Sequence, residues 1–228
     1  MQMSQKEYIN PFSQVSEIYA QKLDDASMSG DIVLLEQLVC EIEKTLPDVD
    51  AASQARLYYS IGTVYSDVAQ AKSLSHEKSI KKQLYAFRKS VGIIEDEEYS
   101  KEEYAPYVNP FKCLLYTNYG NTLCSCGRNI EAIAQYKKAI NIYPLFGMAI
   151  GNLGRVYQDY GVIDYDDGHQ DYFHYFAYSL LKKAVECKDP NTHKAAKHNS
   201  TTGKSFRVFK NKLFSTAHSR YIFSSQFS

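Results

Sequence analysis

A repeat with a period of 34 residues is the sequence feature that most constrains the fold of this chain. The segment LYTNYGNTL around Gly120 aligns with AIGNLGRVY around Gly154, and the two glycines are 34 residues apart. The segment LYYSIGTVY around Gly62 is a third copy. A fixed period of this length is typical of stacked helix pairs, because each pair must bury its apolar face against the next.

The middle copy has the pattern of two antiparallel helices joined by a short turn at Gly127. Small residues at Gly120 and Ala132 let the two helices approach closely. Pro144 follows the second helix, where it cannot interrupt it. Larger side chains fill the space around the small ones: Tyr116, Leu123 and Tyr136. We therefore predict a closely packed helix pair at about residues 113–146.

The two flanking copies, at about residues 55–94 and 147–190, are less regular. In the first, an insertion of about nine residues precedes a second helix that contains Phe87 at the aromatic position, and an extra stretch at 95–110 follows. The third copy contains an insertion of about eleven residues, which includes the acidic run 164–171. We predict that this acidic run is a solvated loop between helices.

Residues 1–50 are predicted to form an amino-terminal helical hairpin that stacks on the first repeat. The segments Pro11–Ala26 and Asp31–Leu46 have apolar residues at a spacing of three to four. Gly30 and Asp31 between them have the residue types of a helix stop and a new N-cap. The apolar positions are Val15, Ile18, Tyr19, Leu23, Val33, Leu34, Leu38, Val39 and Ile42. We predict an all-α, right-handed solenoid of helix pairs, with about eight helices in total.

The repeats at residues 55–190 resemble the tetratricopeptide superfamily, which implies a protein-binding scaffold. Within them, the run 127–155 and the segment LYYSIG at 57–62 are similar to the repeats that precede a HEPN domain in bacterial proteins. Many HEPN domains are ribonucleases of toxin and phage-defence systems, and they use an Arg followed closely by a His. No Arg of this chain has a His five to seven places later, and the 38 residues after Pro190 are too few for such a domain. Nuclease activity is therefore not carried over.

The resemblance implies that the first helices of the pairs line a concave groove that binds a peptide or a partner helix. The groove positions that we single out are Tyr59, Thr63, Thr117, Asn121, Arg155 and Gln158. Asn121 has an amide that can bind a peptide backbone, and Arg155 has a guanidinium that can pair with a carboxylate. The alternative is that these positions are solvated helix faces. Our prediction is a non-catalytic interaction module.

Charge is distributed unevenly along the chain. Residues 1–190 contain 19 basic and 26 acidic residues, a net charge of about −7, whereas residues 191–228 contain seven basic and no acidic residues. We predict that 191–228 is a poorly ordered basic tail. Its interleaved basic and aromatic residues also suggest RNA contacts, through Lys204, Arg207, Lys210 and Lys212. The alternative function is thus the recognition half of a HEPN-type ribonuclease system.

Other function classes lack the sequence patterns that they require. The run 201–205 (TTGKS) lacks the first glycine of a phosphate-binding loop, and the acidic run lacks the Gly and Glu spacing of a calcium loop. We expect no cofactor, no metal and no catalytic site. The chain has no apolar stretch long enough to span a membrane, and its first residues lack the layout of a secretory signal. We therefore expect a cytoplasmic location and no membrane partner.

Overall fold

A computed structural model describes residues 8–70, 75–163 and 167–187 of the chain. The described residues form eight α-helices, two short 3-10 helices at Leu46–Asp48 and Glu97–Ser100, and no strands. The α-helices are α1 (Gln14–Ser29), α2 (Ile32–Thr45), α3 (Ala51–Gln70), α4 (His76–Ile94), α5 (Ala105–Ser125), α6 (Asn129–Ile142), α7 (Gly147–Ile163) and α8 (Asp167–Glu186). The predicted all-α helical-repeat fold is confirmed.

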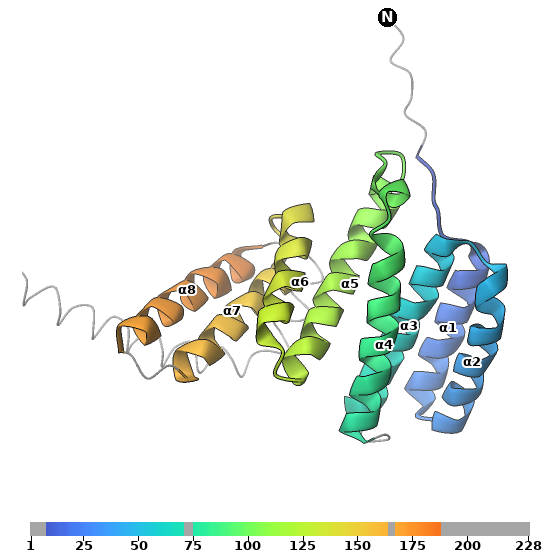
Figure 1. Ribbon diagram of the computed structural model, residues 1–228, viewed down its shortest axis with the longest axis horizontal. Coiled ribbons are helices and arrows are strands. Elements are labelled where there is room, and N and C mark those ends of the chain that lie inside the picture. Colours follow the sequence, from blue (N-terminus) through green and yellow to red (C-terminus); the bar gives the residue numbers. More distant parts are fainter. Residues whose placement is uncertain (1–7, 71–74, 164–166, 188–228) are drawn as a thin grey trace, which may run out of the picture.

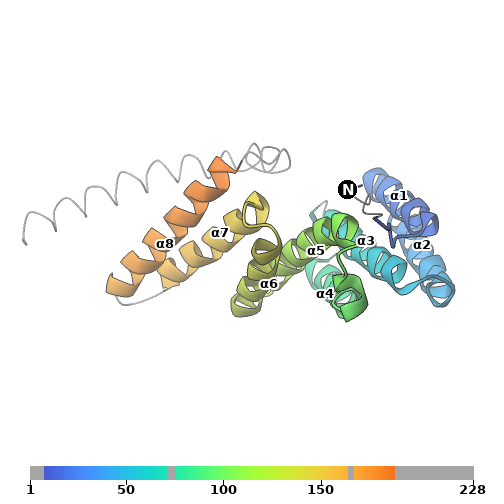
Figure 2. The same cartoon turned by 90° about the horizontal axis from the view of Figure 1, so that it is seen from above.

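The helices are paired in sequence order, and the pairs are stacked along one axis (Figure 1). Within each pair an odd-numbered helix packs against the even-numbered helix that follows it. Between pairs, α1 packs on α3, α4 on α5, and α6 on α7. Seen from above, α4 and α6 lie along one edge of the stack, and α1 lies along the opposite edge (Figure 2). The handedness of the solenoid stays a prediction.

Glycine at the repeat position allows α3 and α5 to touch their partner helices closely. A Cβ atom added to Gly62 would lie 2.6 Å from the ring of Phe87, and one added to Gly120 would lie 2.6 Å from the ring of Tyr136. Real Cβ atoms do not approach other heavy atoms so closely, and therefore only glycine fits at either place. Both rings are almost fully buried. The predicted packing of small residues against large ones is confirmed in these two pairs.

The predicted turn signals lie at helix ends in the structure. Gly30 follows α1 with a φ of 70°, and Gly127 lies between α5 and α6 with a φ of 73°. Both values fall in the left-handed region that favours glycine. Asp31 is the N-cap of α2, where its side chain accepts a hydrogen bond of 3.0 Å from the backbone N–H of Leu34. Pro144 lies just beyond the end of α6, as predicted.

Two helix boundaries differ from the sequence prediction. Helix α5 begins at Ala105, so the last residues of the predicted extra stretch at 95–110 belong to this helix. Pro110 lies inside it, in the second turn. Helix α8 begins at Asp167, so the part of the acidic run from 167 to 171 is helical rather than a loop. Apolar spacing alone did not indicate these turns, because both are rich in polar or aromatic residues.

The amino-terminal hairpin exists, but its apolar residues are only partly buried. Leu23, Leu38, Val39 and Ile42 lie in the core, together with Leu35. By contrast, several residues assigned to the same apolar pattern are exposed: Val15, Ile18, Val33 and Leu34. The reason is geometric, since this pair contacts the rest of the stack on one side only. The apolar pattern therefore predicted the two helices, but it did not show which of their apolar side chains are buried.

Candidate functional site

Three of the predicted groove residues are engaged inside the stack. Thr117 is only 1% exposed, and its hydroxyl donates a 2.7 Å hydrogen bond to the carbonyl of Cys113. Thr63 donates to the carbonyl of Tyr59 at 3.0 Å. The hydroxyl of Tyr59 accepts a 3.0 Å hydrogen bond from the amide of Asn118 on α5. Thr117 is thus inaccessible to a ligand, and this prediction is wrong.

Tyr59 serves mainly to join neighbouring pairs. Its ring lies edge-on to Phe111 of α5, with the centroids 5.4 Å apart, and is tilted against Phe87 of α4 at 6.0 Å. Burial raises the pKa of the Tyr59 phenol above its usual value, so the hydroxyl stays protonated at neutral pH. The ring is a packing element between α3, α4 and α5, and only part of its surface is available to solvent.

Asn121 lies at the centre of a polar network between α5 and α7. Its side-chain oxygen Oδ1 accepts two hydrogen bonds, one from the Tyr136 hydroxyl at 2.9 Å and one from Nδ2 of Asn152 at 2.8 Å. These two donors fix the orientation of the Asn121 carboxamide. Its own Nδ2 group has no hydrogen-bond partner among the described residues. The network therefore holds an exposed N–H donor in a defined position on the surface.

The Tyr136 hydroxyl, which donates to Asn121, is the buried end of the network. The Tyr136 side chain is 1% exposed, and its hydroxyl also lies 3.5 Å from Sγ of Cys124. Burial raises the pKa of Tyr136, as does its contact with Cys124. Burial likewise raises the pKa of Cys124. Both groups are therefore neutral at physiological pH, and they act as hydrogen-bonding groups rather than as charges.

Arg155 and Asp159 extend the network along α7. They follow Asn152 by three and seven residues, so all three lie on one face of the helix. The positive charge of Arg155 is close enough to oppose the pKa increase at both Tyr136 and Cys124. Arg155 is exposed and has no ion-pair partner in the described part of the chain. We call these residues the polar cluster: Asn121, Cys124, Tyr136, Asn152, Arg155 and Asp159.

Two acidic side chains lie close together on α1 and α3. These two helices run side by side in the same direction. Two contacts show this, since Ser53 bonds to Ser13 at 2.8 Å and the later residue Arg56 approaches the later residue Glu17 at 3.9 Å. Further along the same pair of helices, burial raises the pKa of Asp67, and the neighbouring charge of Asp24 adds to this increase. The odd-numbered helices thus have two neighbouring carboxyl groups at α1 and α3, and one Arg and one Asp at α7.

The structure brings together two of the predicted groove residues, Asn121 and Arg155. Gln158 is half-buried on α7, one turn beyond Arg155. The predicted tail residues lie outside the described residues: Lys204, Arg207, Lys210 and Lys212. Within the described ranges, no cluster of three or more side chains has the composition of a metal site. None of the described helices is both long and apolar enough to cross a membrane.

Sequence reasoning missed the partners that orient Asn121. Asn152 was treated only as part of the repeat, and Tyr136 only as a packing residue. One available signal was that Asn152 and Arg155 are three residues apart and so share a helix face. The bond between Asn121 and Asn152 depends on how neighbouring pairs stack, which the repeat pattern does not specify. In comparisons with known proteins, no family model matches the chain and no curated protein matches it.

Proposed function

We propose that this chain is a non-catalytic, tetratricopeptide-like interaction module that binds an extended segment of a partner protein across its odd-numbered helices. The observation that carries the proposal is that one cluster contains the fixed carboxamide of Asn121 and the guanidinium of Arg155, which has no ion-pair partner among the described residues. A cytoplasmic location, expected from the sequence, belongs to the same proposal. The ligand side must supply a hydrogen-bond acceptor and a negative charge close together.

An extended peptide segment with an acidic group meets both requirements. Its backbone carbonyl accepts a hydrogen bond from Nδ2 of Asn121, and its carboxylate pairs with Arg155. Tyr136 and Asn152 hold the Asn121 amide before the ligand arrives, so less side-chain entropy is lost on binding. Asp159, two turns of α7 beyond Asn152, disfavours a second carboxylate on that side and limits where the acidic group can bind.

Selection from a library of short random peptides displayed on phage tests this function. The full chain should enrich peptides that share an Asp, a Glu or a free terminal carboxylate. The variant Asn121→Ala/Arg155→Ala should not enrich that group of sequences. Lys137→Ala/Asn141→Ala is a matched control, because it removes one exposed cation and one exposed Asn from α6. Enrichment of the same peptides by the Asn121/Arg155 variant would contradict the proposal.

A further inference from the structure

A stripe of basic residues follows helix α4. Between His76 and Ile94 the helix has five Lys or Arg residues and one Glu. The net charge of residues 1–190 has the opposite sign, about −7. The basic residues recur at intervals of three and four, so they share one face of the helix with an exposed tyrosine. We call this set the basic stripe: Lys78, Lys81, Lys82, Tyr85, Arg88 and Lys89.

Two of the cations in the basic stripe are neutralised within the protein. Lys81 pairs with Glu77 at 2.6 Å, and Lys82 pairs with Glu36 of α2 at 2.5 Å. By contrast, Lys78, Arg88 and Lys89 are exposed and have no ion-pair partner among the residues that the structure describes. Lys89 lies over the ring of Tyr85, with its ammonium 5.7 Å from the centroid. Three positive charges therefore face solvent along about three turns of α4.

Pockets lie on both sides of the basic stripe and share Tyr85. One, of about 310 Å³, lies towards α2 and is lined in part by Tyr58, Lys81 and Lys82. The other, of about 600 Å³, lies towards α6 and is lined by Leu84, Tyr85, Arg88, Tyr119, Arg128 and Glu131. Tyr85 is 54% exposed and forms the ridge between them. The stripe is thus a ridge with a hollow on each side.

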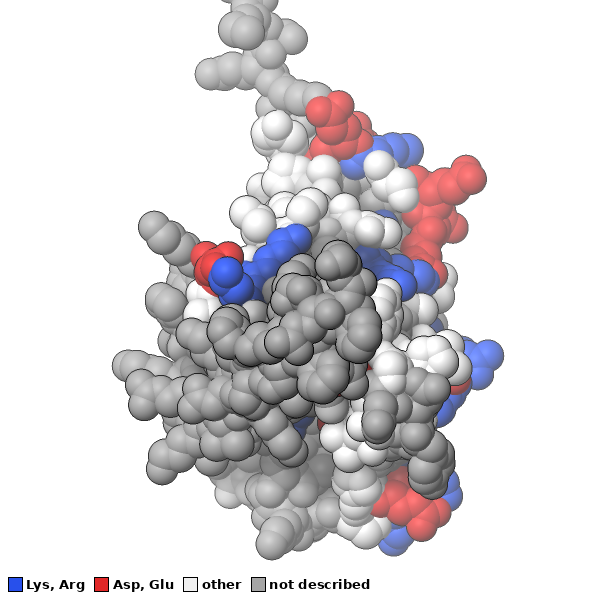
Figure 3. Space-filling view, turned by 90° about the vertical axis from the view of Figure 1, so that its left-hand side faces the viewer, with Lys and Arg blue, Asp and Glu red and all other residues white. Residues whose placement is uncertain are grey.

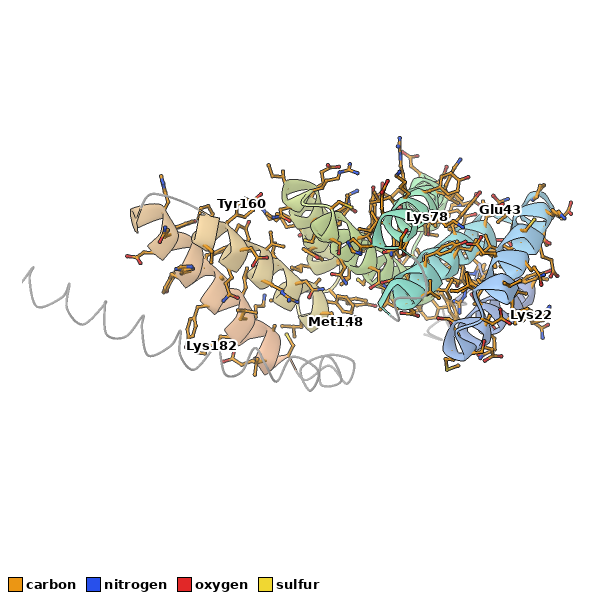
Figure 4. All side chains as sticks on the ribbon, turned by 90° about the horizontal axis from the view of Figure 1, so that it is seen from below. Lys22, Glu43, Lys78, Met148, Tyr160 and Lys182 are labelled. Carbon is orange, nitrogen blue, oxygen red and sulfur yellow. The ribbon has the colours of Figure 1, made fainter. Side chains whose placement is uncertain are left out.

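The basic stripe lies away from the polar cluster. Viewed from below, Lys78 and Glu43 lie along one edge of the stack, and α7 runs from Met148 on the other edge to Tyr160 on the same edge as Lys78 (Figure 4). The two surfaces are separated across α5, because Tyr119 lines the pocket beside Arg88, whereas Asn121, two residues later on another side of the helix, bonds to Asn152 of α7. The end of the molecule that Figure 3 shows has both Lys/Arg and Asp/Glu side chains among its described residues.

We propose that the basic stripe is a second docking surface, and that its occupant is an acidic peptide segment of a partner protein. Charge complementarity carries the proposal. Lys78, Arg88 and Lys89 have no ion-pair partner among the described residues, and they lie near the two ends of one stripe in a body of net negative charge. A helical segment with carboxylates at every third or fourth residue presents one continuous acidic face, which can reach Lys78 near one end of the stripe and Arg88 and Lys89 near the other. Apolar residues of the segment contact Leu84 in the hollow towards α6.

Acidic side chains beside the stripe favour a peptide over a nucleic acid. Glu36 and Glu43 line the pocket towards α2, and Glu131 lines the pocket towards α6. A nucleic acid has a charge on every phosphate and would meet these carboxylates wherever it followed the stripe. A peptide meets fewer of them, because its carboxylates are separated by neutral residues. Because the two sites lie on different sides of α5, the chain is able to join two partners.

Fluorescence anisotropy of a labelled synthetic peptide, in which Glu recurs at every third or fourth position among Ala, Leu and Gln, tests the second surface. The full chain should bind this probe, and Lys78→Ser/Arg88→Ser/Lys89→Ser should raise its Kd about tenfold or more. Lys22→Ser/Lys44→Ser/Lys101→Ser is the control, because it removes the same charge from exposed positions elsewhere. This control should retain the affinity of the parent chain.

The outcomes separate the second surface from its alternatives and from the first site. An equal loss in both triple variants would show that the probe senses only net charge, and the proposal would be wrong. Tighter binding of a labelled single-stranded RNA than of the peptide would also overturn it. Self-association that only the stripe variant abolishes would assign the surface to a second copy instead. In a chain that already contains Asn121→Ala/Arg155→Ala, and so lacks the first proposed site, the probe should still bind, and the stripe substitutions should still raise its Kd about tenfold. The test of the second surface therefore does not depend on the first site.

Discussion

The helix pairs α3/α4 and α5/α6 have the same close packing contact but differ in the polarity of the ring that makes it. In each, a glycine of the odd-numbered helix lies against an aromatic ring of the even-numbered helix: Gly62 against Phe87, and Gly120 against Tyr136. Both rings are at most 1% exposed. The difference is one hydroxyl group. In the first pair the ring only fills space, whereas in the second its hydroxyl reaches the residue after the glycine, Asn121.

This difference shows how a repeat acquires a site without losing its packing. The residue after Gly62 is Thr63, whose hydroxyl donates a hydrogen bond to the carbonyl of Tyr59 in the same helix. The residue after Gly120 is Asn121, which is held from below by Tyr136 and from the side by Asn152. Packing is therefore common to both pairs, and the fixed polar group on the surface belongs to one of them.

The largest expected effect comes from filling either glycine contact. Gly62→Leu and Gly120→Leu should each lower the free energy of unfolding by about 2 to 5 kcal/mol, because a branched side chain would be forced against a buried ring. Chemical denaturation monitored by circular dichroism measures this loss. Gly92→Leu is the control, since a Cβ there meets no atom within 4 Å. If Gly62→Leu alone were harmless, the two contacts would not be equivalent.

Adding the missing hydroxyl to the first pair should cost less. Phe87→Tyr should lower the free energy of unfolding by about 1 to 3 kcal/mol, because a buried hydroxyl would have no acceptor equivalent to Asn121. Thr63, at the equivalent place, has its oxygen one bond nearer to the backbone than Oδ1 of Asn and is held against the carbonyl of Tyr59 within α3. Thermal unfolding detects the loss. An unchanged melting temperature would mean that the two pairs differ less in polarity than the contacts indicate.

Removing the hydroxyl from the second pair should have a smaller effect on stability. Tyr136→Phe should cost about 0.5 to 1.5 kcal/mol, since Asn121 keeps its bond to Asn152. Because the Asn121 amide then has one anchor instead of two, affinity for a selected peptide should also fall. Denaturation and calorimetric titration of the same preparation give both values. A fall in stability with full affinity would show that the hydroxyl serves packing alone.

The smallest expected effect is electrostatic and depends on pH. Where the second pair has Ser125, the first has Asp67, whose pKa is raised above its usual 3.8 by burial and by Asp24. A carboxyl with a raised folded-state pKa loses stabilisation as pH rises through that value. Asp67→Asn should therefore raise the melting temperature at pH 7 and leave it nearly unchanged at pH 3. A decrease at pH 7 would show that the Asp67 carboxylate stabilises the fold.

The repeat pattern predicted what is local and periodic. It predicted the helix pairs, the turn at Gly127 and the close contact at Gly120, because these follow from residue size and from backbone conformation at fixed spacing. It did not predict the helical start of α8, or the exposed side of the amino-terminal hairpin, where Val15 and Val33 face solvent. Those features depend on which surfaces have a neighbour.

The site was predictable only in part for the same reason. Asn121 and Arg155 were identified from their positions in the repeat, and the structure places them in one cluster. Thr117 was identified by the same rule and is buried. Assigning groove residues by their position in the repeat assumes that this position is equally exposed in every repeat. The contacts of α5 with its neighbours, however, differ along its length. The partners Tyr136 and Asn152 depend on packing between helices and are not visible in any one repeat.

The affinity of a selected peptide for the Asn121→Ala/Arg155→Ala variant tests the central claim most directly. Isothermal titration calorimetry should show at least a tenfold rise in Kd, about 1.4 kcal/mol, at an unchanged melting temperature. Added salt should weaken the binding by the parent chain more than the binding by the variant, because only the parent chain has the Arg155 charge. An equal Kd for the two proteins would contradict the claim that the polar cluster is the binding site.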